Sequence, residues 1–110
     1  MKYTKDNPKL VDNIFAFKRM NTFTGVVKDK DNNIVYYLNG QYHREDGPAI
    51  EKRNGDKWWY LNGKRHREDG PAVEWSDGYL NWFFNDECHG WGDSFTNESW
   101  IRFVQLQLLK

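Results

Sequence analysis

Residues 37–51 read YLNGQYHREDGPAIE, and residues 60–74 read YLNGKRHREDGPAVE. The two stretches begin 23 residues apart and are identical at twelve of their fifteen positions. Repetition at a fixed interval of about 20 to 50 residues indicates a repeat architecture, in which each copy forms one supersecondary unit. The sequence therefore predicts tandem units with a 23-residue period.

Weaker copies of the same pattern flank the two clear ones. Three residues of a third copy keep the interval: Phe83, Asn85 and His89. On the N-terminal side, Val26 and Val27 align with the Ala-Ile pair at 49–50. Four units are predicted between about residues 13 and 99. Degenerate copies are expected at the two ends, because an end unit has only one neighbour.

Each unit is predicted to be an antiparallel β-hairpin. Runs rich in aromatic and branched residues, which favour strands, occupy 34–38, 57–61 and 80–84. A turn pair that tolerates positive φ follows each run: Asn39-Gly40, Asn62-Gly63 and Asn85-Asp86. Second short strands are predicted after Gly-Pro, at 49–52 and 72–75. Units this short leave no room for helical crossovers, so the predicted sheet is antiparallel.

Alternation along the long strands assigns their side chains to two faces. One face, which we expect to be the core, carries Tyr36, Leu38, Trp59, Leu61, Trp82 and Phe84. The opposite face carries Val35, Tyr37, Trp58, Tyr60 and Phe83. With rings on both faces, either each face is packed or an aromatic strip remains exposed, and such a strip would be a binding surface.

The last segment changes to a helical period. Trp100, Ile101, Val104 and Leu108 fall on one helix face with Phe103 alongside, and Thr96 or Asn97 is the expected N-cap. We expect this amphipathic helix to cover the open end of the hairpin stack, and a partner-binding helix is the alternative. The predicted organisation is a polar N-terminal segment at 1–12, a β-hairpin repeat domain at 13–96 and a C-terminal helix at 97–110.

The pattern Leu-Asn-Gly-x-x-His-Arg-Glu-Asp-Gly-Pro-Ala, at 38–49 and 61–72, resembles variant MORN repeats. It is most similar to the HREDGPA-type repeats of short phage and large-virus proteins, and the resemblance covers about residues 33–90. The resemblance implies a mainly β fold of consecutive hairpins that stack into an extended sheet. It implies no enzymatic activity, because MORN-type repeats are generally platforms for proteins or membranes.

Three residue types in the repeat invite a chemical role. His43, His66 and His89 recur at the repeat interval, which raises a metal site. A structural role is favoured, because imidazoles in a row do not surround a point and one bonded to a turn carboxylate or carbonyl explains the recurrence. The Glu-Asp pairs at 45–46 and 68–69 precede Gly-Pro and are duplicated, which favours a turn over acid–base catalysis.

Other reactive motifs are weak. Cys88 and His89 are adjacent, so their side chains are expected to point apart, and no nucleophile is predicted. The sequence therefore predicts no catalytic, cofactor-binding or metal-binding residue. Each arginine of the Arg-Glu-Asp turns is expected to pair with a carboxylate of the next unit.

Charge is balanced overall but unevenly distributed. The chain has 16 Lys and Arg against 16 Asp and Glu, which argues against a general polyanion binder. Residues 1–30 carry seven basic and three acidic residues, whereas residues 68–101 carry eight acidic residues and no Lys or Arg. The acidic stretch is also rich in aromatic residues. It therefore predicts a protein partner with a basic surface, and direct nucleic-acid binding is not expected.

The predicted function is a non-enzymatic protein-interaction module. Its predicted partner contacts are Asp77, Trp82, Phe84, Asp86, Glu87, Trp91 and Asp93. The viral resemblance suggests a phage-encoded, anti-CRISPR-like inhibitor of a host protein such as a defence nuclease. The alternative is a repeat that binds a small ligand or a membrane surface, with Trp58, Tyr60 and Trp75 as candidates for a cationic or sugar ligand.

The remaining expectations concern the compartment and oligomeric state. A single cysteine excludes an internal disulfide framework and suits a reducing compartment. No apolar run reaches the roughly 18 residues that span a bilayer, and residues 1–17 contain no apolar signal-peptide core. A cytoplasmic location is predicted, in the host cell if the protein is viral. Open repeat ends favour an end-to-end homodimer.

Overall fold

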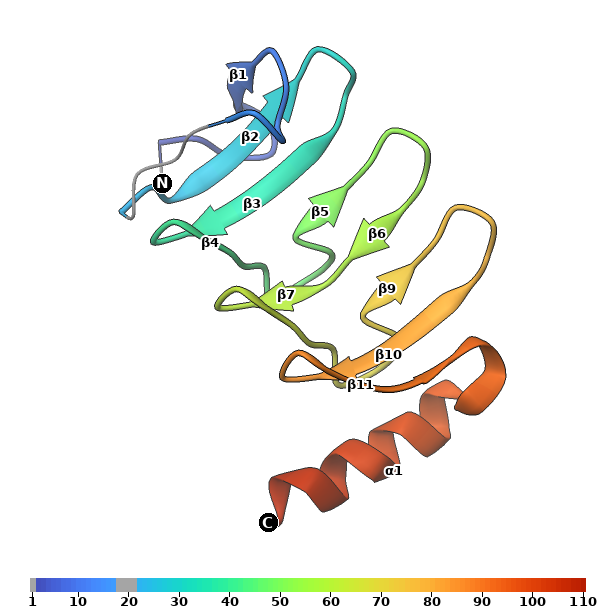
Figure 1. The fold of residues 1–110 in the computed structure, drawn as a ribbon. Coiled ribbons are helices and arrows are strands. Elements are labelled where there is room, and N and C mark those ends of the chain that lie inside the picture. The colour runs from blue at the N-terminus through green and yellow to red at the C-terminus, as the bar shows by residue number, and fades with distance from the viewer. Residues whose placement is uncertain (1, 18–21) are drawn as a thin grey trace.

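The computed structural model describes residues 2–17 and 22–110. In this part the fold is mainly β, with a large mixed sheet, a separate two-stranded sheet and one α-helix at the C-terminal end (Figure 1). The strands are β1 (Lys9–Val11), β2 (Gly25–Asp29), β3 (Ile34–Leu38), β4 (Gln41–Tyr42), β5 (Ile50–Glu51), β6 (Lys57–Trp58), β7 (Tyr60–Leu61), β8 (Lys64–Arg65), β9 (Val73–Glu74), β10 (Leu80–Phe84) and β11 (Glu87–Trp91). The 3-10 helix η1 spans Gly92–Ser94, and the helix α1 spans Asn97–Leu108.

The strands of the large sheet follow one another in chain order. The sheet runs β1-β2-β3-β5-β6-β9-β10-β11, with β4 beside β3, while β7 and β8 form the two-stranded sheet. All neighbours are antiparallel except β1 and β2, which are parallel. The prediction of antiparallel hairpins alone is therefore wrong at the N-terminal edge, where the polar segment at 1–12 contributes β1.

The long strands were predicted from their aromatic and branched residues. The runs at 34–38 and 80–84 form β3 and β10 with the predicted bounds. The run at 57–61 divides at Trp59, because Lys57 and Trp58 pair with β5 and β9 whereas Tyr60 and Leu61 pair with β8. The change of partner along one strand breaks this run into β6 and β7.

The predicted turns are confirmed by their backbone angles. Asn39, Asn62 and Asn85 have φ values of 50°, 50° and 48°. The residue after the last of them, Asp86, also has a positive φ, of 71°, which is uncommon for a residue with a side chain. These turns connect β3 to β4, β7 to β8 and β10 to β11.

The core lies on the face that the sequence assigned to the exterior. Val35 and Tyr37 are 2% and 4% exposed, whereas Tyr36 and Leu38 are only partly buried. The predicted core face is therefore wrong in this half of the molecule. The reason is tertiary, because Ile14 from the segment between β1 and β2 packs with Val35 and Tyr37 in one buried cluster.

Both faces are buried at the C-terminal end of the sheet. Trp82 packs with Trp100 and Val104 of α1, while Phe83 packs with Ala72 and Val73 on the other face. The register of β10 and β11 shifts between Trp82 and Phe83, which leaves an extra residue in β11. A bulge of this kind bends the strand and disrupts the ladder at the sheet edge.

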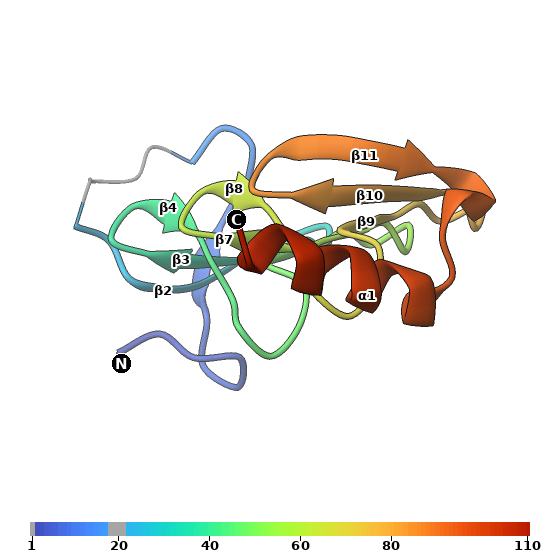
Figure 2. The same ribbon diagram turned by 90° about the horizontal axis from the view of Figure 1, so that it is seen from below.

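The predicted C-terminal helix is present. Thr96 is the N-cap: its hydroxyl accepts a hydrogen bond from the Ser99 amide, and the Ser99 hydroxyl accepts one from the Thr96 amide. Trp100 and Val104 are buried, but Ile101 and Leu108 remain 38% and 60% exposed. The helix lies across the end of the sheet beside β10 and β11 (Figures 1 and 2). Within the described ranges, no helix has the length and apolarity needed to cross a bilayer.

Candidate functional site

Two loops of nearly identical sequence project from the same face of the sheet. They are the first loop, residues 43–51, and the second loop, residues 66–74. In each loop an arginine lies over an aromatic ring of the preceding strand: the guanidinium of Arg44 is 4.1 Å from the ring centroid of Tyr36, and that of Arg67 is 4.0 Å from Trp59. A guanidinium over a ring is attracted by the electrons of the ring face.

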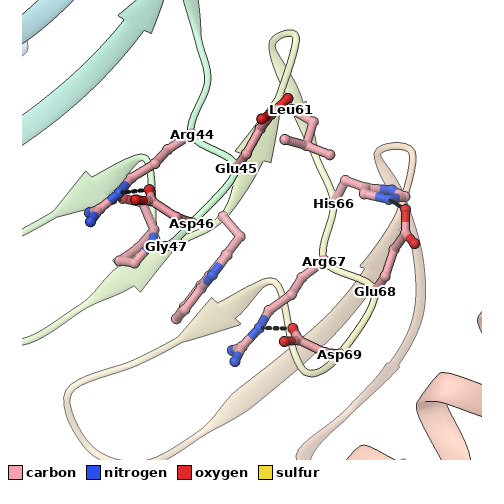
Figure 3. A pocket seen from close by; sticks show the side chains of 11 residues that line it. Arg44, Glu45, Asp46, Gly47, Leu61, His66, Arg67, Glu68 and Asp69 are labelled. Carbon is pink, nitrogen blue, oxygen red and sulfur yellow. Dashed lines mark hydrogen bonds and ion pairs between the residues drawn. The ribbon is translucent and has the colours of Figure 1, made fainter.

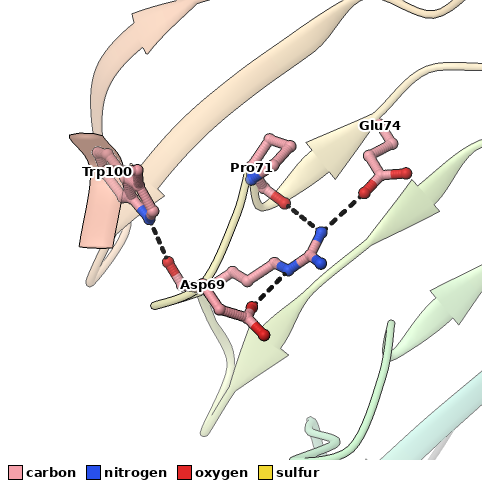
Figure 4. A network of polar contacts seen from close by, with 5 residues as sticks. Asp69, Pro71, Glu74 and Trp100 are labelled. Atoms are coloured by element: carbon pink, nitrogen blue, oxygen red, sulfur yellow. Dashed lines mark hydrogen bonds and ion pairs between the residues drawn. The ribbon is translucent and has the colours of Figure 1, made fainter. Parts of the chain in front are cut away.

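The second loop is closed by hydrogen bonds of its arginine (Figure 4). The Nε of Arg67 donates to Oδ1 of Asp69 at 2.9 Å, and its Nη1 donates to the carbonyl of Pro71 at 3.1 Å and to Oε2 of Glu74 at 2.7 Å. The indole Nε1 of Trp100 donates to the Arg67 carbonyl at 2.7 Å and so ties α1 to the loop.

The first loop repeats these closing contacts. The Nε of Arg44 donates to Oδ1 of Asp46 at 2.8 Å, and its Nη1 donates to the carbonyl of Pro48 at 3.2 Å. The prediction that these arginines pair with a carboxylate of the next unit is therefore wrong, because both bond within their own loop. The arginine that reaches forward is Arg65, whose Nε lies 2.6 Å from Oδ1 of Asp86.

Two of the repeated histidines connect successive turns. The Nδ1 of His43 accepts a hydrogen bond from the Asn62 amide at 2.9 Å, and that of His66 accepts one from the Asn85 amide at 3.0 Å. A backbone N–H only donates, so these Nδ1 atoms carry no hydrogen and the ring proton is on Nε2. In His66 this Nε2 lies 3.0 Å from Oε2 of Glu68.

The structural role predicted for the histidines is confirmed for His66, which bonds a turn carboxylate. The turn amide is a second partner that the sequence did not predict. His89 behaves differently, because its ring lies 4.8 Å from that of Phe103 and leans against α1. Over the described residues, no group of three His, Cys, Asp or Glu side chains is arranged to hold a metal ion.

A groove of about 760 Å³ separates the two loops (Figure 3). Trp59 and Leu61 line it, and the exposed carboxylates of the two loops stand on either side. These carboxylates are Glu45, Asp46, Glu68 and Asp69. Because both arginines and His66 already bond within the fold, the groove is a seam between two loops whose rim is acidic.

A second candidate lies on the opposite face of the sheet. Directly paired residues place one row of side chains across seven strands, and paired residues share a face. The row is Val27, Val35, Ile50, Trp58, Val73, Asn81 and Trp91. It begins with fully buried side chains, such as Val27 at 0% exposed, and ends with Trp91 at 59% exposed.

The exposed end of this row carries two further rings. Trp75 is 39% exposed and donates from its indole Nε1 to Oδ1 of Asn81 at 2.6 Å. Tyr79 is 46% exposed, and its ring lies beside Gly92, because a Cβ placed at Gly92 would be 3.6 Å from Cε1 of Tyr79. We term Trp75, Tyr79 and Trp91 the aromatic patch.

The aromatic patch is bordered by acidic residues. Asp77 and Asp93 are exposed, and Oδ1 of Asp77 accepts a hydrogen bond from the Tyr79 amide at 2.9 Å. Asp93 belongs to η1, which follows Trp91 directly. The patch is therefore a mixed aromatic and anionic surface of the kind that anchors a cationic partner.

The predicted partner contacts fall into separate places. Asp77, Trp91 and Asp93 adjoin the aromatic patch. Phe84, Asp86 and Glu87 lie at the other end of β10 and β11, roughly 13–17 Å away for a five-residue strand. Trp82 is 1% exposed beneath α1, so it is excluded as a surface contact and its prediction is corrected.

The contacts at the turn end have partners within the fold. Arg65 lies over the ring of Phe83, and its hydrogen bond to Asp86 holds the pKa of that carboxyl below its ordinary value. The ring of Phe84 is partly buried, 4.8 Å from His66. Glu87 is exposed.

The sequence missed two of the three rings of the patch as partner contacts. Trp75 and Tyr79 belong to the acidic and aromatic stretch at 68–101, but its composition does not indicate which rings α1 covers. Of the three residues predicted for a small ligand, Trp58 and Trp75 lie in contact with ring centroids 5.9 Å apart, whereas the ring of Tyr60 packs against Tyr42.

No family model, curated protein or solved structure matches the chain. The candidate site is therefore interpreted from its own geometry.

Proposed function

We propose that this protein is a non-enzymatic interaction module that binds another protein through the aromatic patch. The observation that carries the proposal is the exposure of three large rings at one end of a row that is otherwise buried. Large exposed apolar surfaces on a single chain commonly mark interaction sites, and Trp and Tyr are enriched among the residues that dominate binding energy.

The proposed scaffold is a stack of MORN-like hairpin repeats with a 23-residue period. In support, Arg44 and Arg67 make the same ring contacts and loop-closing bonds. The amide bonds to His43 and His66 are also 23 residues apart. Backbone bonds tie the same positions together, since the Gly63 amide bonds to the Tyr42 carbonyl as the Asp86 amide does to that of Arg65.

The proposed absence of catalysis rests on how the reactive side chains are used. The imidazole of His66 has both nitrogens engaged, one by a turn amide and one by Glu68. Arg44 and Arg67 are held against rings and aspartates. These groups act as connectors of the scaffold, which leaves the surface for recognition.

The proposed partner is a protein with a basic surface. The stretch at 68–101 carries eight acidic residues and no Lys or Arg, and complementary charge speeds the encounter of two proteins. In the version suggested by the viral resemblance, the chain is a phage-encoded inhibitor and its partner is a host protein with a basic nucleic-acid-binding groove.

Affinity purification with matched variants tests the proposal. The wild type, a Tyr79→Ala/Trp91→Ala variant and a Leu10→Ala control are each incubated with a lysate of the natural host. We expect a stoichiometric partner to be retained by the wild type and the control, because Leu10 is 75% exposed but outside the patch. The partner should be lost from the double variant, and equal retention by all three chains would contradict the proposal.

A further inference from the structure

Three arginines of this protein are held in one recurring arrangement. Each guanidinium lies over an aromatic ring, 4.0 to 4.3 Å from its centroid, and its Nε lies within hydrogen-bond distance of an aspartate. The sets are Arg44 with Tyr36 and Asp46, Arg65 with Phe83 and Asp86, and Arg67 with Trp59 and Asp69. The Nε to Oδ1 distances are 2.8, 2.6 and 2.9 Å.

The aromatic patch supplies two of the three parts of this arrangement. Its rings stand beside Asp77 and Asp93, and Trp91 is separated from Asp93 by one residue. The part that is missing is the cation, since residues 68–101 contain no Lys or Arg. Charge complementarity therefore specifies a cationic group as the occupant of the patch.

We propose that the aromatic patch binds arginine side chains of the partner, with each guanidinium against a ring and bonded to Asp77 or Asp93. This inference rests on the proposed function and names the chemistry that its site recognises. Arginine is preferred to lysine because a planar guanidinium stacks on a ring and offers a carboxylate two parallel N–H donors. A lysine ammonium is more strongly hydrated and lacks this fork.

The exposed rings, rather than the edge of the sheet, are the part that a partner reaches. Beside Trp91 the edge of β11 is occupied, because the Trp91 amide donates to the Ser94 hydroxyl at 3.2 Å and that hydroxyl donates to the Trp91 carbonyl at 2.7 Å. An extended strand cannot pair with these two groups without displacing Ser94. Side-chain recognition at the patch is therefore the mode that the geometry favours.

A pair of synthetic peptides tests the inference. One peptide repeats the triplet Arg-Gly-Gly and the other repeats Lys-Gly-Gly, with equal length and charge. Each is titrated into the full chain and followed by isothermal calorimetry and tryptophan fluorescence. We expect the arginine peptide to bind about tenfold tighter than the lysine peptide, because only arginine offers both the stacked plane and the paired donors.

Matched variants locate the binding. Asp93→Asn and Trp91→Ala should each weaken the arginine peptide by roughly fivefold to tenfold, since each removes one of the two contacts. Glu45→Gln removes the same charge from the first loop, where its side chain is 85% exposed, and should leave the affinity unchanged. Because these side chains are exposed, circular dichroism should show the same fold in all the chains.

The outcomes separate this inference from the proposed function. Equal affinity for the two peptides, no binding of either, or binding that survives both patch variants would overturn the arginine assignment. If a host protein is nevertheless captured in a Trp91-dependent manner, the interaction function stands without it. If the peptides discriminate but no captured partner depends on the patch, the proposed function fails while the arginine preference holds.

Discussion

Ile50 and Trp91 belong to one row of side chains on one face of the sheet, yet Ile50 is 2% exposed and Trp91 is 59% exposed. Ile50 packs with Ile14 and Tyr37 under the segment that joins β1 to β2. The strands at the two ends follow the same alternation. The comparison teaches that a covering segment, and not the strand pattern, decides whether this face is a core or a surface.

The largest expected difference between the two ends is in stability. Ile50→Ala leaves a cavity in the covered cluster and should lower the free energy of unfolding by about 2–5 kcal/mol. Chemical denaturation followed by tryptophan fluorescence measures the change, with Leu10→Ala, 75% exposed, as the control. A loss below about 1 kcal/mol, the size expected at an exposed site, would show that the covered end is not a packed core.

The second prediction concerns the group that holds the cover. Oδ2 of Asp29 accepts a hydrogen bond from the Ile14 amide at 3.1 Å, and the Asp29 side chain is buried. Asp29→Asn offers an N–H donor where an acceptor is needed and should cost about 1–3 kcal/mol of the free energy of unfolding. Asp31→Asn, at an exposed position in the adjacent turn, is the matched control and should be nearly neutral.

The same carboxylate makes the cover sensitive to acid. Burial raises the pKa of Asp29, but hydrogen bonds from Ile14, Asn33 and Asp31 outweigh it and hold the pKa below its ordinary value of 3.8. A lowered native pKa gives stability that is complete above the unfolded pKa and is lost as the pH falls through the native one. Asp29→Asn should therefore show a flatter decline of unfolding free energy below pH 3.8 than the wild type. Parallel curves would contradict this assignment.

The third prediction concerns the open end. Asn81 holds the indole of Trp75 through a 2.6 Å hydrogen bond, so Asn81→Ala should cost about 0.5–1.5 kcal/mol and loosen the aromatic patch. Binding of the arginine peptide should weaken in the same variant. Asn54→Ala, at an exposed loop position outside the patch, serves as the binding control. Unchanged binding by Asn81→Ala would show that Trp75 needs no such support.

The smallest expected change in stability is at the end of the row. Trp91→Ala removes a side chain that is largely in solvent, so its effect on the free energy of unfolding should stay within about 0.5 kcal/mol. Thermal or chemical denaturation gives the value. A cost comparable to that of Ile50→Ala would mean that Trp91 belongs to the core and is not a recognition residue.

Strands, turns and the helix were predictable because their signals are local. Asn39 and Asn62 adopt the positive φ that their turn pairs require, and Thr96 caps α1 as its sequence indicated. The faces were not predictable in the same way. Which face of β3 is buried depends on Ile14, a residue outside the hairpin, and no pattern within the strand contains that information.

Trp59 and Trp82 show the same limit for the candidate site. They are 23 residues apart, but Arg67 covers Trp59 while Trp100 and Phe95 cover Trp82. The position that corresponds to Arg67 is Gly90, where a Cβ would lie 2.7 Å from Cβ of Ser94. The glycine lets the chain turn back so that α1 replaces the arginine, and this contact between distant segments removed Trp82 from the predicted surface.

Hydroxyl-radical footprinting of the free chain and of its complex with the captured partner tests most directly whether the aromatic patch is the interaction surface. The account predicts that Trp75, Tyr79 and Trp91 are oxidised in the free chain and protected in the complex, while Leu109 on the helix stays reactive in both. Rings of the patch that remain as reactive in the complex as in the free chain would contradict it.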